Sequence, residues 1–376
     1  MILQQPPLWL ALVAFVCVLG PLVFFHELGH YLVARLFGVP AESFSIGFGR
    51  ELFGWTDRQG TRWKVAWLPL GGYVKFVGDM NAASEPGAAE DIPEELRARA
   101  FQFRPVWQRF LIVLAGPVAN FILAILIFSA FFTFVGIPRT NVVGKVLPGS
   151  AASAAGIQPG DRILSVAGRS TPTFDDISNV VSVRANEHVD VDLVRDGQPR
   201  TLRVTVRSDS SPDPFGQKIP HGLLGVYPTA QALQPVPVYK AVPLAVDYTA
   251  RLTRSMVDNI GMIFRGRISP TELKGPVGIA QFAGQAASLG VLPVVVLIAL
   301  ISINLGFINL LPVPMLDGGH LFFYIVEAIR RRPVSEQIME WAFRGGLALI
   351  LALLAFTTFN NLASVGLWDR LERLID

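Results

Sequence analysis

Five consecutive residues near the start of the chain, His26-Glu27-Leu28-Gly29-His30, bring two imidazoles and a carboxylate together. In a helix, positions four residues apart lie on the same face, one turn from each other, so His26 and His30 can bind one metal ion. Glu27 then lies beside the metal, where it can take a proton from water. The pattern predicts a zinc (Zn2+) site with Glu27 beside the water that the metal binds.

The surroundings of this motif favour a metal site. The alternative is a buried cluster of histidines whose polar atoms are satisfied without metal. The chain has only five His, and three ionisable groups inside an apolar helix are costly unless they have a function. The single cysteine, Cys17, excludes both a disulfide framework and a cysteine-based zinc site within one chain.

A catalytic zinc usually has three protein ligands and one open position, so the two histidines leave one ligand to be found. Asp317 is our first candidate, because it is an acid placed where the hydropathy pattern predicts lipid. At ~1.5 Å rise per residue, His26 and Asp317 lie toward the same side of their apolar segments. His320 is the rival ligand, and an ordinary helix cap is the alternative role for Asp317. We expect Asp317, because a carboxylate completes a two-histidine site.

Composition predicts a membrane protein, and the placement of its basic residues predicts that both ends of the chain lie outside the cytoplasm. The 376 residues are 51% hydrophobic and 16% charged, with mean hydropathy +0.45. The arginines at 330–332 and Arg344 place the loop before the last span in the cytoplasm, by the positive-inside rule. Net charge is only +3 and dispersed, so no nucleic-acid binding is expected, and residues 1–8 lack the basic start of a signal peptide. The candidate spans are residues 8–36, 110–135, 291–316 and 345–365.

Two segments between the candidate spans have strand character. Residues 44–77 alternate polar and apolar side chains, with a turn at Gly71 and Gly72, which predicts a β-sheet beside the membrane. Residues 142–207 contain valine-rich strands at 142–147, 189–195 and 201–207 and resemble a bacterial PDZ domain. Such a domain binds a peptide by strand addition or only blocks bulky substrates, and the sequence leaves both open.

The predicted fold class is a polytopic α-helical membrane protein of about four transmembrane helices, with a membrane-associated β-sheet and an inserted extracytoplasmic PDZ domain. We expect these parts in chain order: 1–37 first transmembrane helix with the metal motif; 38–105 cytoplasmic-side β-sheet and loop; 106–138 second transmembrane helix; 139–228 PDZ domain; 229–290 amphipathic membrane-surface linker; 291–330 third transmembrane helix with Asp317; 331–376 cytoplasmic loop, fourth transmembrane helix and tail.

In these motifs the chain resembles the site-2 protease family of intramembrane zinc metalloproteases, of the bacterial regulator-of-sigma-E protease type. The resemblance covers nearly the whole chain. It is carried by residues 26–30, the Gly71-Gly72-Tyr73-Val74-Lys75 turn, Gly116-Pro117 with Asn120, and residues 309–319.

The resemblance implies Zn2+ held by His26, His30 and Asp317, with Glu27 as base and Asn309 contacting the substrate or its developing oxyanion. It also implies that the strands with Gly71, Gly72 and Tyr73 bind the substrate. A transmembrane helix satisfies its own backbone and must unwind before cleavage, and strand pairing offers its freed groups partners. The implied substrate is a single-pass membrane protein, such as an anti-sigma factor or a remnant signal peptide. The implied location is the bacterial inner membrane, with the zinc site near the cytoplasmic side.

Two departures and two alternative functions remain. The best-known regulator-of-sigma-E protease has two tandem PDZ domains, and this chain has room for one. Phe359-Asn360-Asn361 stands where that family often has Phe-Asn-Asp, so no role for an acid at 361 carries over. A catalytically silent PDZ scaffold in the membrane is the first alternative function. A transporter is the second, and the H-E-x-x-H motif and the lack of an inverted repeat argue against it.

Overall fold

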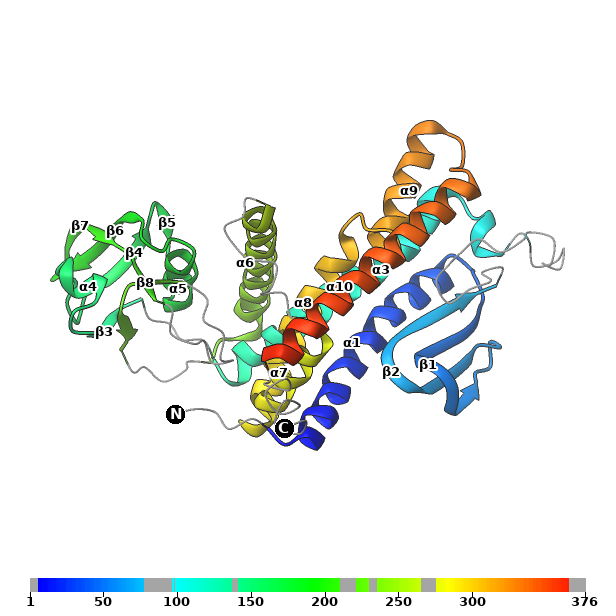
Figure 1. Cartoon of the computed structure of the whole chain (residues 1–376), viewed down its shortest axis with the longest axis horizontal. Coiled ribbons are helices and arrows are strands. Elements are labelled where there is room, and N and C mark those ends of the chain that lie inside the picture. Colours follow the sequence, from blue (N-terminus) through cyan, green and yellow to red (C-terminus); the bar gives the residue numbers. More distant parts are fainter. Residues whose placement is uncertain are drawn as a thin grey trace, which may run out of the picture. The chain divides into compact units, whose positions relative to one another are not determined.

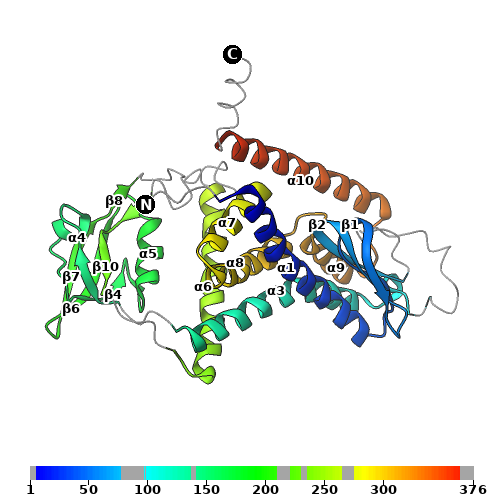
Figure 2. The same cartoon turned by 90° about the horizontal axis from the view of Figure 1, so that it is seen from below.

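The computed structural model describes residues 6–77, 97, 99–136, 141–209, 221–229, 235–264 and 275–364. These residues form two compact units (Figures 1 and 2). Unit 1 contains Met1–Phe128 and Val242–Asp376, and unit 2 contains Ser129–Ala241. Most of the loop and short helix expected at 81–103 lies outside the described residues, and so do the side chains of Asn360 and Asn361.

Long apolar helices dominate unit 1. Among the described residues, four helical stretches are long and apolar enough to cross a membrane: Leu8–Leu36, Val106–Phe134, Val291–Leu310 and Gln337–Thr357. The last belongs to a helix that begins at Glu336, so the apolar stretch expected from 345 starts inside a longer helix. The helices are α1 (Leu8–Leu36), α3 (Val106–Phe134), α6 (Val238–Phe264), α7 (Pro276–Ser288), α8 (Val291–Leu310), α9 (Asp317–Arg330) and α10 (Glu336–Ser364).

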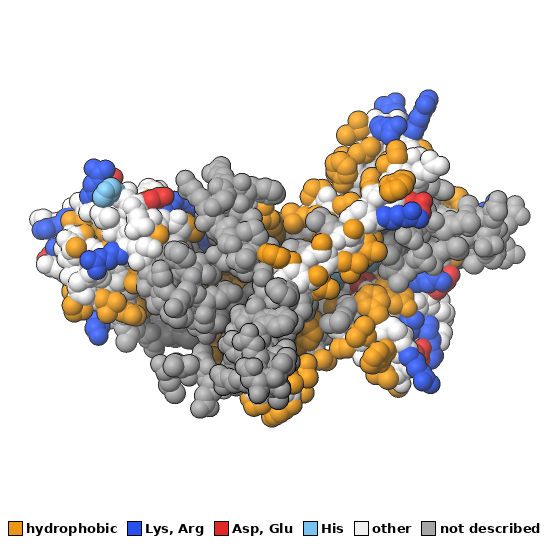
Figure 3. Space-filling view, viewed as in Figure 1, with side chains coloured by type: hydrophobic (Ala, Val, Ile, Leu, Met, Phe, Trp, Pro, Cys, Tyr) orange, Lys and Arg blue, Asp and Glu red, His pale blue; other side chains and the backbone are white. Residues whose placement is uncertain are grey.

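Many apolar side chains on these helices stay exposed in the folded chain, as Figure 3 shows for one face. Exposing so many apolar side chains to water would be unfavourable, whereas exposing them to lipid is not. Each helix also satisfies its own backbone hydrogen bonds, as a membrane span must. The exposed side chains include Leu12, Val16, Leu32, Ile122, Leu126, Phe134, Val291, Leu292, Leu351 and Leu354. The surface therefore agrees with a multi-pass membrane protein.

The third apolar segment is not one helix, contrary to the single element expected at 291–330. Helix α8 ends at Leu310, and α9 begins at Asp317. Pro312 and Pro314 cause the break, because proline has no N–H to donate to a preceding turn and disfavours helical geometry in the residue before it. Asp317 therefore lies in the first turn of a new helix and not at the end of a span.

The expected β-sheet is present in β1 (Ala41–Thr56) and β2 (Arg62–Phe76), beside the C-terminal half of α1 (Figures 1 and 2). Residues 43–46 pair with both 62–65 and 72–75, and 62–65 also pair with 53–56. The two strands therefore bend into four short segments, in which 72–75 form one edge.

Unit 2 has its own hydrophobic core, built from its strands and two helices. Its largest sheet is antiparallel, with strand order β5-β4-β6-β7, and two further strand pairs are β10-β3 and β8-β9. A capping box between Thr173 and Asp176 starts the longer helix. The elements are β3 (Val143–Val146), α4 (Ala151–Ala154), β4 (Arg162–Val166), β5 (Arg169–Ser170), α5 (Phe174–Ser182), β6 (His188–Arg195), β7 (Gln198–Thr205), β8 (Arg207–Asp209), β9 (His221–Leu223) and β10 (Val226–Pro228).

Candidate metal centre

Helix α1 places His26, Glu27 and His30 in the interior of unit 1, and all three are buried. Most of the helix is apolar, so three ionisable side chains are unusual in it and indicate a functional site. The spacing of four residues sets the imidazole rings 4.9 Å apart, centroid to centroid. The motif therefore has the geometry that its spacing predicts.

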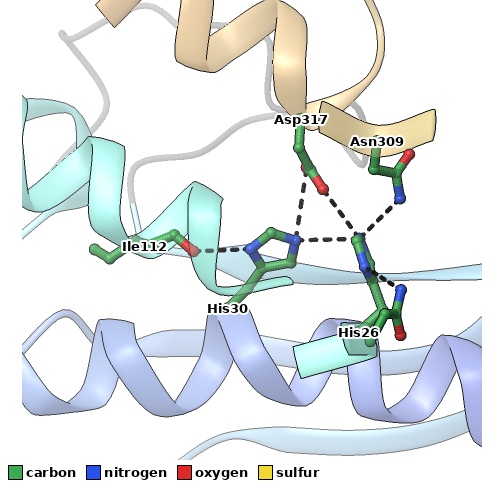
Figure 4. Close-up of polar contacts among 6 residues, drawn as sticks. His26, His30, Ile112, Asn309 and Asp317 are labelled. Carbon is green, nitrogen blue, oxygen red and sulfur yellow. Dashed lines mark hydrogen bonds and ion pairs between the residues drawn. The ribbon is translucent and has the colours of Figure 1, made fainter. Parts of the chain in front are cut away.

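Asp317 meets the two imidazoles from the other side of the site (Figure 4). Its Oδ2 lies 3.1 Å from Nε2 of His26, and its Oδ1 lies 3.6 Å from Nε2 of His30. One ligand atom from each of the three residues lies within 4.8 Å of the others. In the first turn of α9, the carboxylate is also close to the positive end of the helix dipole.

These distances suit a tetrahedral zinc. Two ligand atoms at the usual ~2.0–2.1 Å from tetrahedral zinc lie roughly 3.3–3.4 Å from each other, and the two Nε2 atoms are 3.3 Å apart. Oδ2 of Asp317 is buried and accepts no hydrogen bond in the described part of the chain. A cation between the three residues would satisfy this atom and offset the repulsion between facing lone pairs. The residues present therefore fit the metal.

A backbone carbonyl fixes the orientation of His30. Nδ1 of His30 lies 2.9 Å from the carbonyl oxygen of Ile112 on α3. A carbonyl only accepts, so Nδ1 carries the proton and the lone pair of Nε2 faces the cluster. Gly116, one turn further along α3, leaves the ring its space, since a Cβ there would lie 2.2 Å from Nε2 of His30.

Asn120 of α3 orients His26. Its side-chain amide lies 3.0 Å from Nδ1 of His26, with the nitrogen facing the ring, while its Oδ1 is buried and has no partner among the residues that the structure describes. The two ends of an amide are assigned from hydrogen bonding. With the amide turned over, Oδ1 accepts the proton of Nδ1 and leaves Nε2 of His26 free to bind metal. Asn120 thus satisfies its own oxygen and sets the histidine tautomer in one contact.

Glu27 connects α1 to the edge of the sheet. Its carboxylate lies beside the backbone of Val74, and both residues line the same cavity. Gly72 lies so close to this helix that a Cβ there would lie 2.6 Å from Val23 and 3.1 Å from Cγ of Glu27. The edge segment 72–75 therefore runs directly past the candidate base.

Asn309 and His320, the remaining polar candidates, both line the cavity of about 420 Å³ beside the cluster. Nδ2 of Asn309 lies 3.4 Å from Nε2 of His26 (Figure 4). The imidazole of His320 packs on Phe343, 4.9 Å between ring centroids, and is not part of the three-residue metal group. Gly72 and Tyr73 line the cavity, whereas Gly71 does not.

Sequence reasoning assigned no role to Ile112, Gly116 or Asn120, although the last two were part of a recognised motif. The available signal was a polar residue, Asn120, inside an apolar segment. The role of Ile112 is carried by its backbone, which no residue type reveals.

Comparisons with known proteins agree over most of the chain. Residues 14–353 match the family described as peptidase family M50. A candidate zinc metalloprotease of Mesorhizobium japonicum is 45% identical over 360 residues, covering 93% of this chain and 98% of that protein. Metalloprotease MmpA of Caulobacter vibrioides is 38% identical, with 93% and 95% covered. The regulator of sigma E protease of Salmonella typhi is 32% identical, with 93% and 98% covered.

Solved structures are similar to a part of the chain, and one of them is the PDZ domain of an SdrC-like protein from Listeria monocytogenes. The identity is 13% and the TM-score 0.19, and the match covers 26% of this chain and 90% of that one.

Proposed function

This chain belongs to peptidase family M50, the site-2 proteases, and is therefore a zinc metalloprotease. We propose that it cleaves membrane-embedded protein segments at a zinc site formed by His26, His30 and Asp317. The convergence of these three donors from two distant parts of the chain, within 4.8 Å, carries the assignment. Bound zinc would supply a Lewis acid that polarises the peptide carbonyl and makes water more acidic.

The residues around the cluster divide the remaining chemistry. Glu27 takes the proton of the attacking water and passes it to the leaving amide nitrogen. Asn309 points its side-chain amide toward Nε2 of His26, so its N–H groups can donate to the carbonyl oxygen as negative charge develops. Ile112 and Asn120 hold the two imidazoles in the tautomer that binds metal.

The edge of the sheet supplies a place for the substrate backbone. Segment 72–75 pairs with 43–46 on one side, and its other side lies toward α1 and the cavity. A substrate helix must unwind before its peptide bond reaches the site, and an extended segment added to this edge regains backbone hydrogen bonds. Gly72 and Tyr73 are therefore the substrate-binding residues in this proposal. Gly71 instead takes a positive φ of 111° that permits the bend.

The relatives support the proposed substrate class and location. The Salmonella relative is named regulator of sigma E protease, which supports a single-pass anti-sigma factor as the proposed substrate. A remnant signal peptide is the other substrate that the family resemblance implies. The relatives are bacterial, and together with the four apolar helices they support a bacterial membrane, which we propose is the inner one. The arginines at 330–332 and Arg344 support the proposed orientation, with unit 2 outside the cytoplasm and the metal site near the cytoplasmic face. A silent scaffold would not need the intact donor set and Glu27.

Metal analysis of two matched variants tests the ligand assignment. Asp317→Ala should lose zinc and activity, because only two protein ligands remain. His320→Ala removes a nearby imidazole of the same cavity and should keep most of its zinc. Zinc per chain, measured on purified protein, separates the two, and the reverse pattern would make His320 the ligand.

A further inference from the structure

Arg109, near the start of α3, is held at three points. Its guanidinium pairs with Oε1 of Glu327 on α9 at 2.6 Å, and its Nε donates to the carbonyl oxygen of Arg104 at 3.0 Å. The same guanidinium lies over the ring of Tyr324, 4.9 Å from the centroid. Both charged side chains are only 16% exposed, so this ion pair is better shielded from water than an ordinary surface pair.

The two α9 residues that Arg109 contacts belong to the helix that begins with Asp317. Tyr324 follows Asp317 by two helical turns, and Glu327 by about one turn more. The start of α9 is packed tightly: a Cβ at Gly318 would lie 2.1 Å from the carbonyl oxygen of Leu311. Helix α9 is short and is held near both ends, so any shift along its axis would displace Asp317.

The same turn of α3 also orients His30, the metal ligand next to Asp317. Ile112 follows Arg109 by three residues and accepts the Nδ1 proton of His30. One turn of α3 therefore touches His30 directly and reaches Asp317 through α9. A change in the distance between α3 and α9 would alter the spacing of these two ligands.

We propose that Arg109 is a positioning residue, which sets Asp317 at the metal site by clamping α9 to α3 through Glu327 and Tyr324. This inference rests on the proposed function, since it takes Asp317 as a ligand. Loss of one partner leaves the other charge partly buried and unpaired, so α9 should shift to expose it to water. Small shifts of a reacting or binding group have large effects on rate.

The test compares Arg109→Met and Glu327→Gln with a matched control, Arg344→Met. Arg344 is also paired with an acid, Glu340, but on the exposed surface of α10. Zinc release to a chelator, the absorption bands of the cobalt-substituted enzyme, kcat and KM are measured on each full-length variant. We expect about 10–100-fold faster zinc release, shifted cobalt bands and a lower kcat with KM unchanged. The control should behave as wild type.

The charge-reversed double variant, Arg109→Glu with Glu327→Arg, keeps the experiment decisive if the single variants fold poorly. It should recover part of the zinc retention that each single reversal loses. Wild-type zinc release and kcat in Arg109→Met would overturn the proposal. Unchanged cobalt bands in the folded fraction, with only thermal stability lowered, would overturn it too, as would a double variant no better than the single reversals. Zinc retained by Asp317→Ala would instead refute the proposed ligand set.

Discussion

His30 and Gly116 occupy adjoining space so closely that a Cβ on residue 116 would lie 2.2 Å from Nε2 of His30. The contact joins α1 to α3 at the nitrogen that faces Asp317. A glycine is thus required here for lack of space beside the imidazole of His30. It is not required by the backbone, since Gly116 has a helical conformation that any residue could adopt.

Gly116→Ala should therefore lower zinc affinity and activity. The added methyl group has to displace the imidazole or push α3 away from α1, because the contact falls far below van der Waals distance. The matched control is Gly20→Ala, since Gly20 lies inside helix α1, as Gly116 lies inside α3, and a Cβ there meets nothing within 4 Å. Zinc content of both purified variants checks the prediction, and equal zinc in the two would contradict it.

Asn120→Leu should weaken zinc binding while leaving the fold intact. The leucine has a similar size but offers no acceptor to Nδ1 of His26, and losing such an outer contact typically costs about 10–100-fold in metal affinity. Ser302→Ala is the control, because Ser302 donates to the backbone oxygen of Asn120 and does not reach the imidazole. Competition with a chelator gives both zinc dissociation constants, and an unchanged constant for Asn120→Leu would refute the role.

Much of this site could be predicted from the sequence. The spacing of His26 and His30 is local, so a helix alone brings the imidazoles together. Asp317 can be predicted as the third ligand by comparing how far His26 and Asp317 lie along their two apolar segments. The helix break before it was missed, because hydropathy counts the apolar residues between Leu310 and Asp317 without regard to Pro312 and Pro314.

The supports of the ligands could not be predicted in the same way. The contacts of Ile112 and Gly116 with His30 depend on how α3 packs against α1, which no local pattern encodes. The double pairing of residues 43–46 in the sheet is similar, since alternation predicts strands but not where a strand bends back. Arg109 and Glu327 are two ordinary charges in the sequence, and only the packing of α9 on α3 pairs them.

Unit 2 should lose stability at acidic pH through Asp161. Burial alone raises the pKa of this carboxyl, but hydrogen bonds from Arg195 and from the backbone of Gln158 outweigh it and hold the pKa below its ordinary value. A lowered pKa gives stability that is present above the unfolded value of ~3.9 and is lost as pH falls toward the folded value.

Thermal unfolding of a fragment spanning residues 142–229, recorded from pH 7 down to pH 2, checks this prediction. The melting temperature should fall below about pH 4. Asp161→Asn should melt lower at pH 7 and change less between pH 4 and pH 2. Asp176→Asn, which alters the capping box at the start of α5, serves as the comparison. Parallel curves for wild type and Asp161→Asn would contradict the assignment.

Unit 2 should act as a size filter that is separable from the chemistry. Residues 142–229 can be replaced by a short linker, because the N–H of Thr229 lies 3.2 Å from the carbonyl oxygen of Val142. The shortened enzyme should bind zinc normally and cleave substrates whose outward portion is still bulky. A control carries the same linker inserted at the Asp196-Gly197 turn. Slower cleavage of trimmed substrate by the shortened enzyme would instead indicate that unit 2 grips a peptide, and unchanged rates for both substrates would end the filter idea.

The central claim is that Glu27 performs acid–base chemistry beside a zinc held by His26, His30 and Asp317. Its most direct test measures zinc per chain and cleavage of a transmembrane substrate on the same purified Glu27→Gln sample, with Glu187→Gln, at an exposed position in unit 2, as control. The account predicts wild-type zinc and no detectable cleavage, because the ligands remain and proton transfer is lost. Cleavage near the wild-type rate by Glu27→Gln would contradict it.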